Sequence, residues 1–403
     1  MSVRNSGSAL GRPSVHPFPA RMAPELALKE LARLRKGAVV LDPMAGSGTV
    51  VALAQSRGLR AIGFDVDPLA VLMASVWTRA VDKARVRSAA VRALARARQR
   101  MMVCAVADAY PARADTETKA FVRYWFDGYA RRQLASLATA IDALRDEAVR
   151  NVLWCAFSRL IIAKQAGASR AMDLSHSRPH RAFERAPRKP FGEFMAAVEK
   201  VLAGCLDADD AHASVTASVC LGDVRSLRVM ARSVDLVFTS PPYLNAIDYL
   251  RCSKFSLVWM GYSIAELRRI RSESIGSYAA GECDAALEAL ARRECDWDGL
   301  SPRAQGILAR YLTDTERSLK AIKRVLAPLG RAVYVVGENC IEGVYVPTGS
   351  LIRAIAKMVG LRAVRGRVRP LPASRRYMPP PRAEGGMLDR RMNQEVIVNL
   401  RSA

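Results

Sequence analysis

Two polar stretches, each directly after an apolar run, have the residue types that bind and position a small ligand. Val234 to Phe238 is an apolar run that predicts a buried strand. The turn that follows Thr239 consists of Ser240, Pro241, Pro242 and Tyr243. Two consecutive prolines end the strand and hold the backbone extended, so that a hydroxyl, a carbonyl and an aromatic ring lie in one rigid turn. In isolation, such a turn more often ends a strand beside a core tyrosine, so the interpretation depends on the second stretch.

The second stretch is a glycine-containing turn inside a predicted β-α-β unit. Ala38 to Leu41 predicts a buried strand, Thr49 to Arg57 a helix, and Arg60 to Phe64 a second strand that ends in Asp65. The turn between the first strand and the helix runs from Asp42 to Thr49 and contains two glycines. Glycines let the backbone approach a ligand, the helix N-terminus offers free N–H groups, and an acid after the second strand accepts hydrogen bonds from ribose hydroxyls. The spacing G-x-G-x-x-G is absent, which favours a nucleoside without a pyrophosphate.

A third acid completes the pattern. Val215 to Leu221 predicts a strand, and Asp223 follows it. In an open parallel sheet the carboxyl ends of the strands meet at one crevice, so we expect Asp42, Asp65, Asp223 and the proline turn to face a single ligand.

The composition limits the classes of protein to which the chain can belong. The chain has 403 residues, of which half are hydrophobic and a quarter charged, which predicts one large domain with an insertion, or two domains. No apolar run is long enough to span a bilayer and the first residues lack a signal-peptide pattern, so we expect a soluble, cytoplasmic protein. The eight cysteines form no C-x-x-C pair and there are only four histidines, which indicates reduced thiols and no metal site.

The formal charge of +24, carried mostly by arginine, favours a polyanionic partner. Nucleic acid is the commonest polyanion in a cytoplasm. The alternative is an arginine-rich surface that contacts only solvent. Charge alone favours nucleic acid modestly.

The order of the predicted elements indicates an α/β fold with a doubly wound, mostly parallel sheet, an antiparallel terminal strand and a helical insertion. Residues 1–80 and 215–403 form the two parts of the sheet domain, and residues 81–214 form the insertion. Within the insertion we expect the helices Ala84 to Met101, Tyr129 to Leu144, Asn151 to Lys164 and Phe191 to Cys205. Further along, Tyr311 to Leu326 predicts a helix, Ile270 to Pro302 an irregular excursion, and Leu361 to Val368 with Glu395 to Leu400 a terminal strand pair.

These motifs together resemble the S-adenosylmethionine-dependent DNA amino-methyltransferases, the class that modifies cytosine N4 or adenine N6. Residues 42–49 resemble the family's D-P-F-x-G-x-G-T cofactor loop with Met44 in place of Phe, and residues 239–243 resemble its catalytic turn in the TSPPY form. The segment 16–24 resembles the one that closes over the methionine end of the cofactor. The resemblance implies the fold described above and cofactor contacts from Phe18, Asp42, Pro43, Met44, Gly46, Gly48, Thr49, Asp65 and Asp223.

The sequence departs from the family where the insertion separates the ribose acid, Asp65, from the adenine acid. Typical members place the second acid soon after the first. Asp108 or Asp115 could take that role instead. Neither follows an apolar strand, so Asp223 is preferred.

The chemistry implied by the resemblance is methyl transfer to an exocyclic amine. The lone pair of such an amine is delocalised into the ring, so the Ser240 hydroxyl and the Pro241 carbonyl would accept its hydrogens and draw the nitrogen toward tetrahedral geometry. Tyr243 would stack on the flipped base. Positioning and electrostatics suffice without a covalent nucleophile or a metal. The serine favours cytosine N4, with adenine N6 in DNA, an amino group in RNA, and a non-catalytic cofactor-binding regulator as alternatives.

Two basic segments are candidates for contacting DNA, the expected partner. One lies in the insertion and the other in the loop between the terminal strands; the residues are Arg178, His180, Arg181, Arg375 and Arg376. A structural cap with a solvated arginine face explains the first segment about equally well, and a surface loop is the alternative for the second. The resemblance also implies a cognate restriction endonuclease as a further partner.

Overall fold

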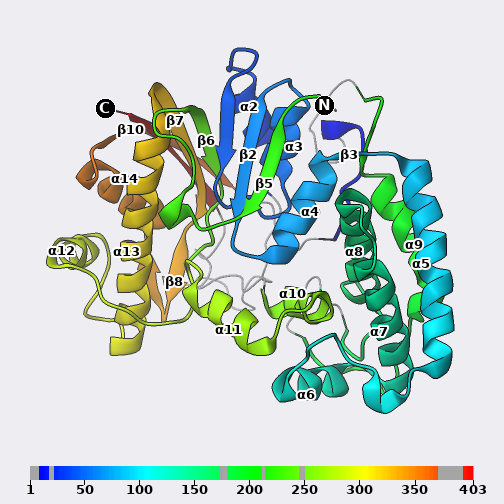
Figure 1. The fold of residues 1–403 in the computed structure, drawn as a ribbon. Helices are drawn as coiled ribbons and strands as arrows, with labels where there is room; N and C mark the ends of the chain where they lie inside the picture. The colour runs from blue at the N-terminus through cyan, green and yellow to red at the C-terminus, as the bar shows by residue number, and fades with distance from the viewer. Residues whose placement is uncertain are drawn as a thin grey trace.

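The computed structural model describes residues 9–17, 22–172, 174, 179–210, 214–244, 250–370 and 394–402. A seven-stranded sheet in the order β10-β11-β7-β6-β1-β2-β5 forms its centre, with helices on both faces (Figure 1). Its strands are β1 (Val39–Asp42), β2 (Arg60–Asp65), β5 (Ala217–Leu221), β6 (Val234–Thr239), β7 (Leu326–Gly337), β10 (Leu361–Pro370) and β11 (Gln394–Ser402).

The strand directions confirm the predicted fold class. Neighbouring strands from β5 to β7 pair in parallel, whereas β11 pairs antiparallel with both β7 and β10. The terminal strand pair is present, and β11 lies inside the sheet rather than at its edge.

Successive side chains of the central strands point to opposite faces of the sheet, and this divides the core into two layers. Val40 and Leu236 pack with one set of helices, while their neighbours Leu41 and Val237 pack with the other. The first set comprises α2 (Pro24–Leu31) and α3 (Thr49–Gln55), and the second α12 (Ala285–Glu294), α13 (Pro302–Val325) and α14 (Thr348–Met358). Residues buried on both faces explain why these strands are near-continuous apolar runs in the sequence.

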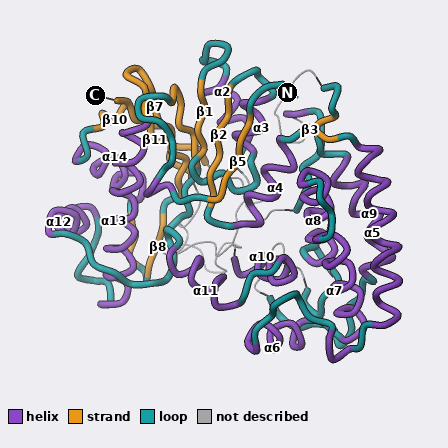
Figure 2. The backbone as a smooth tube through the Cα atoms, viewed as in Figure 1, coloured by secondary structure: helices purple, strands orange, loops and turns teal. Residues whose placement is uncertain are grey.

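The helical region leaves the sheet after β2 and returns to it before β5. Its elements are α4 (Pro68–Thr78), β3 (Ala80–Val81), α5 (Lys83–Val103), η1 (Val106–Asp108), α6 (Thr116–Trp125), α7 (Gly128–Asp142), α8 (Glu147–Ile161), α9 (Pro190–Leu202) and β4 (Leu206–Asp207). The short strands β3 and β4 pair with one another where the chain leaves and rejoins the sheet domain. These helices, α4 included, stand to one side of the sheet (Figure 2). They share one hydrophobic cluster with three later elements: α10 (Leu250–Leu257), η3 (Val258–Met260) and α11 (Ile264–Glu273).

The prediction that the segment from Ile270 to Pro302 is irregular is wrong. The end of α11 and the whole of α12 lie in this segment. Asp284 caps α12 by accepting from the Leu287 backbone N–H at 2.9 Å, and Leu287, Leu290 and Ala291 are buried. These three buried apolar side chains are enough to hold a ten-residue segment with several charges in a helix, because α13 and α14 cover them.

The structure also differs from the sequence predictions in smaller ways. Helix α13 begins at Pro302 rather than Tyr311, because Ser301 caps it and proline suits its first turn. The hairpin β8 (Asn339–Ile341) with β9 (Val344–Val346) follows β7 and was not predicted. Among the described helices, none is both long and apolar enough to cross a membrane.

Candidate functional site

The carboxyl ends of β1, β2, β5 and β6 lie side by side at one edge of the sheet. Parallel pairing sets Asp42 beside Gly63, and Asp65 beside Leu221. Thr239 ends β6, and Asp223 follows β5 by two residues. The sheet therefore brings the three predicted acids and the proline turn to the same edge.

The turn from Asp42 to Thr49 takes a shape that requires glycine. Gly46 and Gly48 have φ angles of +50° and +82°, which favour glycine over other residues. A Cβ atom on Gly48 would lie 2.6 Å from the Cβ of Ala74 on α4, so this position has no room for a side chain. The loop is therefore pressed against α4, and α3 begins immediately after it at Thr49. Pro43, Met44 and Thr49 lie within this loop or at its end, as predicted.

Asp42 connects the glycine loop to the proline turn. The Thr239 hydroxyl donates to Asp42 Oδ1 at 2.8 Å, and the Met44 backbone N–H donates to the same oxygen at 3.2 Å. Asp42 is 2% exposed and Thr239 is fully buried. Burial, with a smaller contribution from the Asp65 carboxylate, raises the pKa of Asp42 to about 7, although the hydrogen bonds from Thr239 and Met44 lower it.

Asp65 connects the glycine loop to the start of α4. Its Oδ2 accepts from the Gly46 backbone N–H at 2.8 Å, and its Oδ1 accepts from the Asp67 backbone N–H at 2.9 Å. The residue as a whole is half-buried, and its two carboxylate oxygens hold the glycine loop and the start of α4 together. Burial raises the pKa of Asp65 above its usual range, against the backbone hydrogen bonds that lower it.

Asp67 is a member of the site that the sequence analysis missed. It caps α4 by accepting from the Leu69 backbone N–H at 2.9 Å, and it accepts from the Ser253 hydroxyl of α10 at 2.7 Å. Burial raises the pKa of Asp67 to about 7. The sequence does contain the cap signal, an aspartate directly before a proline, but not the contact with Ser253, which lies 186 residues away.

The proline turn lies between the ends of β6, β7 and β11. The ring of Tyr243 packs against the backbone of Gly337, where an added Cβ would lie 3.0 Å from its Cε2. Burial and the nearby Glu395 raise the pKa of Tyr243 above its usual range, and a hydrogen bond with Ser240 offsets part of this. Gly276 covers the other side of the turn, where a Cβ atom added to this glycine would lie 2.9 Å from the Tyr243 carbonyl oxygen. Pro241 is buried, whereas Ser240 and Pro242 are half-buried.

Asp223 has a different environment from the other acids. Arg225 Nε donates to both of its carboxylate oxygens at 3.0 Å, and Arg225 Nη1 donates to Asp314 Oδ1 at 2.7 Å. Asp108 and Asp115 are the alternatives to Asp223 as the adenine-binding acid. Asp108 ends η1, and Asp115 caps α6 by accepting from the Thr118 N–H at 2.7 Å. Both belong to the helical region, so Asp223 alone of the three follows a strand of the large sheet.

Several predicted contact residues lie apart from this edge or outside the described residues. Those outside are Phe18, Arg178, Arg375 and Arg376. His180 and Arg181 belong to the helical region, where the Arg181 guanidinium lies 5.7 Å from the centre of the Tyr124 ring. Arg181 also forms an antiparallel bridge with Ala171, so it occupies a defined position.

The electrostatics of the edge favour a ligand with hydroxyl groups or a positive charge. In the described parts of the chain, Asp42, Asp65 and Asp67 bond only to backbone N–H groups and hydroxyls, with no lysine or arginine paired to them. The described residues contain no group of three or more metal-ligating side chains. A hydroxyl or a cation of a ligand could bond to such carboxylates without displacing a lysine or arginine of the described residues.

Comparison with known proteins adds a resemblance in sequence. No family model matches the chain. It is 22% identical over 393 residues to the Type II methyltransferase M.MvaI of Kocuria varians, covering 89% of this chain and 84% of that protein. Among solved structures, it is similar to a TehB-like SAM-dependent methyltransferase from Corynebacterium glutamicum, with a TM-score of 0.30, 10% identity, and coverage of 94% and 88%. It is also similar to TrmN from Thermus thermophilus, with a TM-score of 0.34, 12% identity, and coverage of 99% of this chain and 53% of that one. Such low TM-scores add nothing to the fold assigned from the sheet order.

Proposed function

We propose that this protein is an S-adenosylmethionine-dependent DNA methyltransferase that modifies the N4 amine of cytosine after base flipping. The observation that carries the proposal is the hydrogen bond between Thr239 and Asp42, which joins the glycine loop to the proline turn at one edge of the sheet. A ligand seated on the loop would thus lie beside the turn. The similarity to a Type II methyltransferase over most of both chains supports the same conclusion.

The residues of the crevice fit this cofactor. Gly46 and Gly48 leave two positions of the loop without a side chain, and Asp65 is the proposed acceptor of hydrogen bonds from ribose hydroxyls. Acids without a lysine or arginine partner among the described residues suit a cationic ligand, and Asp223, which Arg225 holds just beyond the end of β5, is the proposed contact of the adenine end. When bound, S-adenosylmethionine supplies an electrophilic methyl group on a positively charged sulfur.

The chain's own groups would position and activate the amine. The Ser240 hydroxyl and the Pro241 carbonyl accept its hydrogens, which pulls the nitrogen toward tetrahedral geometry and frees its lone pair. Tyr243 supplies an aromatic surface for the base, and its contacts with Gly337 and Ser240 fix the ring in place. The step needs orientation more than acid-base chemistry, because the amine gives up its proton only as the new bond forms.

The helical region is the proposed reader of the DNA. Arg181 lies beside the half-exposed ring of Tyr124, with His180 next to it in the sequence, and arginine next to an aromatic ring is typical of nucleic-acid surfaces. A restriction endonuclease that cuts the same DNA sequence would be the cognate partner. Residues 81–214 would then form a unit specialised for recognition.

One assay tests the reaction and its substrate. The protein is incubated with S-adenosylmethionine labelled in the methyl group and with separate pools of DNA and RNA, and the methylated nucleoside is identified by mass spectrometry. N4-methylcytosine in DNA is the expected product. N6-methyladenine in DNA would move the assignment to the other amine, label in RNA alone would overturn the DNA proposal, and binding without transfer would favour a regulator.

A further inference from the structure

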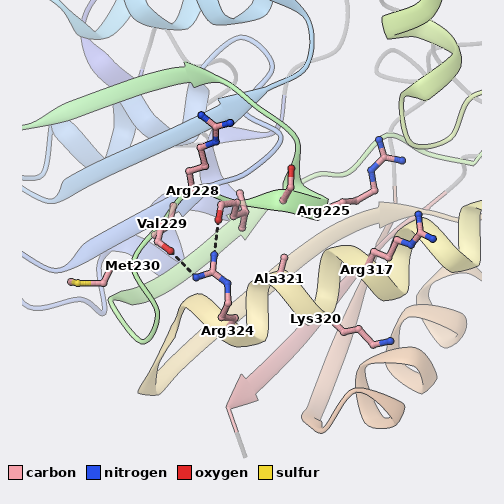
Figure 3. A pocket seen from close by; sticks show the side chains of 10 residues that line it. Arg225, Arg228, Val229, Met230, Arg317, Lys320, Ala321 and Arg324 are labelled. Carbon is pink, nitrogen blue, oxygen red and sulfur yellow. Dashed lines mark hydrogen bonds between the residues drawn. The ribbon is translucent and has the colours of Figure 1, made fainter.

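A cleft of about 780 Å³ lies beside the crevice, between α13 and the segment that leads from β5 to β6 (Figure 3). This segment begins with η2 (Val224–Ser226). Five of the ten residues that line the cleft are basic: Arg225, Arg228, Arg317, Lys320 and Arg324. None of the ten is acidic, so the cleft is a concentrated positive surface.

Three of these cations are held by neighbouring groups. Arg225 is bonded to Asp223 and Asp314, and Lys320 pairs with Glu316 at 2.9 Å. Arg324 donates to the backbone carbonyls of Leu227 and Val229, the bonds drawn as dashed lines in Figure 3. These two bonds fix one wall of the cleft, and they also cover carbonyl oxygens that would repel an anion.

The other two cations, Arg228 and Arg317, are exposed and have no acidic or hydrogen-bonding partner within the described residues. They come from opposite walls, Arg228 from the segment after η2 and Arg317 from α13. A guanidinium presents a planar fork of donors that matches two oxygens of a phosphate. The cleft thus offers two unoccupied phosphate-binding groups on a wall that is already rigid.

We propose that this cleft binds phosphates of the DNA backbone and extends the DNA-binding surface beyond the crevice. The proposal rests on the proposed function for the identity of the nucleic acid. None of the ten lining residues is aromatic, so the cleft lacks a surface on which a base could stack. Its chemistry therefore fits the sugar-phosphate chain, independent of sequence. Arg225, which contacts both Asp223 and the cleft, connects this surface to the crevice.

The test removes the two unpaired charges and measures DNA binding without cofactor. The double variant Arg228→Gln and Arg317→Gln leaves Arg225, Lys320 and Arg324 in place. At about 0.15 M salt we expect its affinity for a duplex of about 30 base pairs to fall about tenfold, and the slope of log K against log salt to become shallower by about two. Fluorescence anisotropy over a salt series gives both values. The loss should be equal for a duplex that the enzyme methylates and for an unrelated one.

Arg303→Gln is the matched control, because Arg303 is an exposed arginine on the same helix, with no partner among the described residues, outside the cleft. We expect this variant to lose less than about twofold in affinity. Equal losses in the control and the double variant, an unchanged salt slope, or a loss confined to one DNA sequence or to RNA would each overturn the proposal. The anisotropy needs no methyl transfer, so failure of the cleft and failure of the enzymatic function give different results. Unchanged thermal unfolding of both variants verifies that they are folded.

Discussion

Two groups of acids lie at the same edge of the sheet and are satisfied in opposite ways. Asp42, Asp65 and Asp67 bond to backbone N–H groups and hydroxyls. Asp223 and Asp314 share the guanidinium of Arg225. In a chain with a net charge of +24, arginine is abundant, so its absence as a partner of the first group among the described residues is a specific feature of the site.

The pKa values reflect this difference. Burial raises the pKa values of Asp42 and Asp67 to about 7, and no cation among the described residues pairs with either group to lower them. The pKa of Arg225 is raised by its bonds to Asp223 and Asp314 despite the cost of burial. We infer that the first group is arranged for a ligand that brings its own hydroxyls or positive charge, whereas the second is held in place by an arginine.

The largest effect is expected at Asp65. Asp65→Ala removes the acceptor of the Gly46 N–H and the proposed acceptor of the ribose hydroxyls, so affinity for S-adenosylmethionine should fall at least about 100-fold, or about 3 kcal/mol. Isothermal titration calorimetry measures this change. Ser240→Ala is the comparison variant, which should bind the cofactor normally and transfer the methyl group about 100-fold more slowly. An equal loss of cofactor binding in both variants would contradict the division between a loop that binds and a turn that reacts.

The second effect concerns stability. Arg225→Gln leaves Asp314, which is 3% exposed, without its closest cation, so we expect a loss of about 2 kcal/mol in the free energy of unfolding. The more distant contact of Asp314 with Arg310, at 3.7 Å, limits the loss. Urea denaturation of the variant and the wild-type protein gives the difference.

Adding Asp314→Asn to Arg225→Gln provides the control, because the double variant no longer buries an unpaired charge. It should recover more than half of the lost stability. No recovery would mean that Arg225 stabilises the fold through packing or through the Glu273 carbonyl, to which it also donates, rather than through the ion pair.

The sequence predicted the sheet and the strand ends because these depend on local patterns. Short, mostly apolar runs bounded by turn residues, such as Val234 to Phe238, favour buried strands, and the glycine loop after β1 has a shape that few residues allow. Parallel strands then bring Asp42, Asp65 and Asp223 together without further information. For the same reason the terminal pair of β10 and β11 was predictable.

Contacts between residues distant in sequence were not predictable. Arg225 lies 89 residues from Asp314, and Asp67 lies 186 residues from Ser253, and neither pair leaves a local signal. Helix α12 escaped prediction for a related reason: its short apolar face is stabilised by α13 and α14, not by its own sequence. The division between paired and unpaired acids therefore became visible only in the structure.

The smallest effect distinguishes Asp67 from the paired acids by its response to pH. Because the pKa of Asp67 is raised in the folded state, that state binds the proton more tightly than the unfolded chain, so stability is greatest at low pH and falls as the pH rises toward 7. Asn at this position still accepts from the Leu69 N–H and can donate to Ser253, but it does not titrate.

The free energy of unfolding of wild-type protein relative to Asp67→Asn should therefore decrease by about 1 kcal/mol between about pH 6 and about pH 7.5. Urea denaturation at several pH values measures it, and titration of Asp42 cancels in the comparison because both proteins retain that group. Glu199→Gln is the contrasting variant, because the hydrogen bond from Arg87 lowers the pKa of this paired carboxyl, so the substitution should not flatten the pH profile in that interval. Parallel profiles for wild-type and Asp67→Asn would mean that a cation or a proton donor satisfies Asp67 in solution, and the distinction between the two groups of acids would not hold.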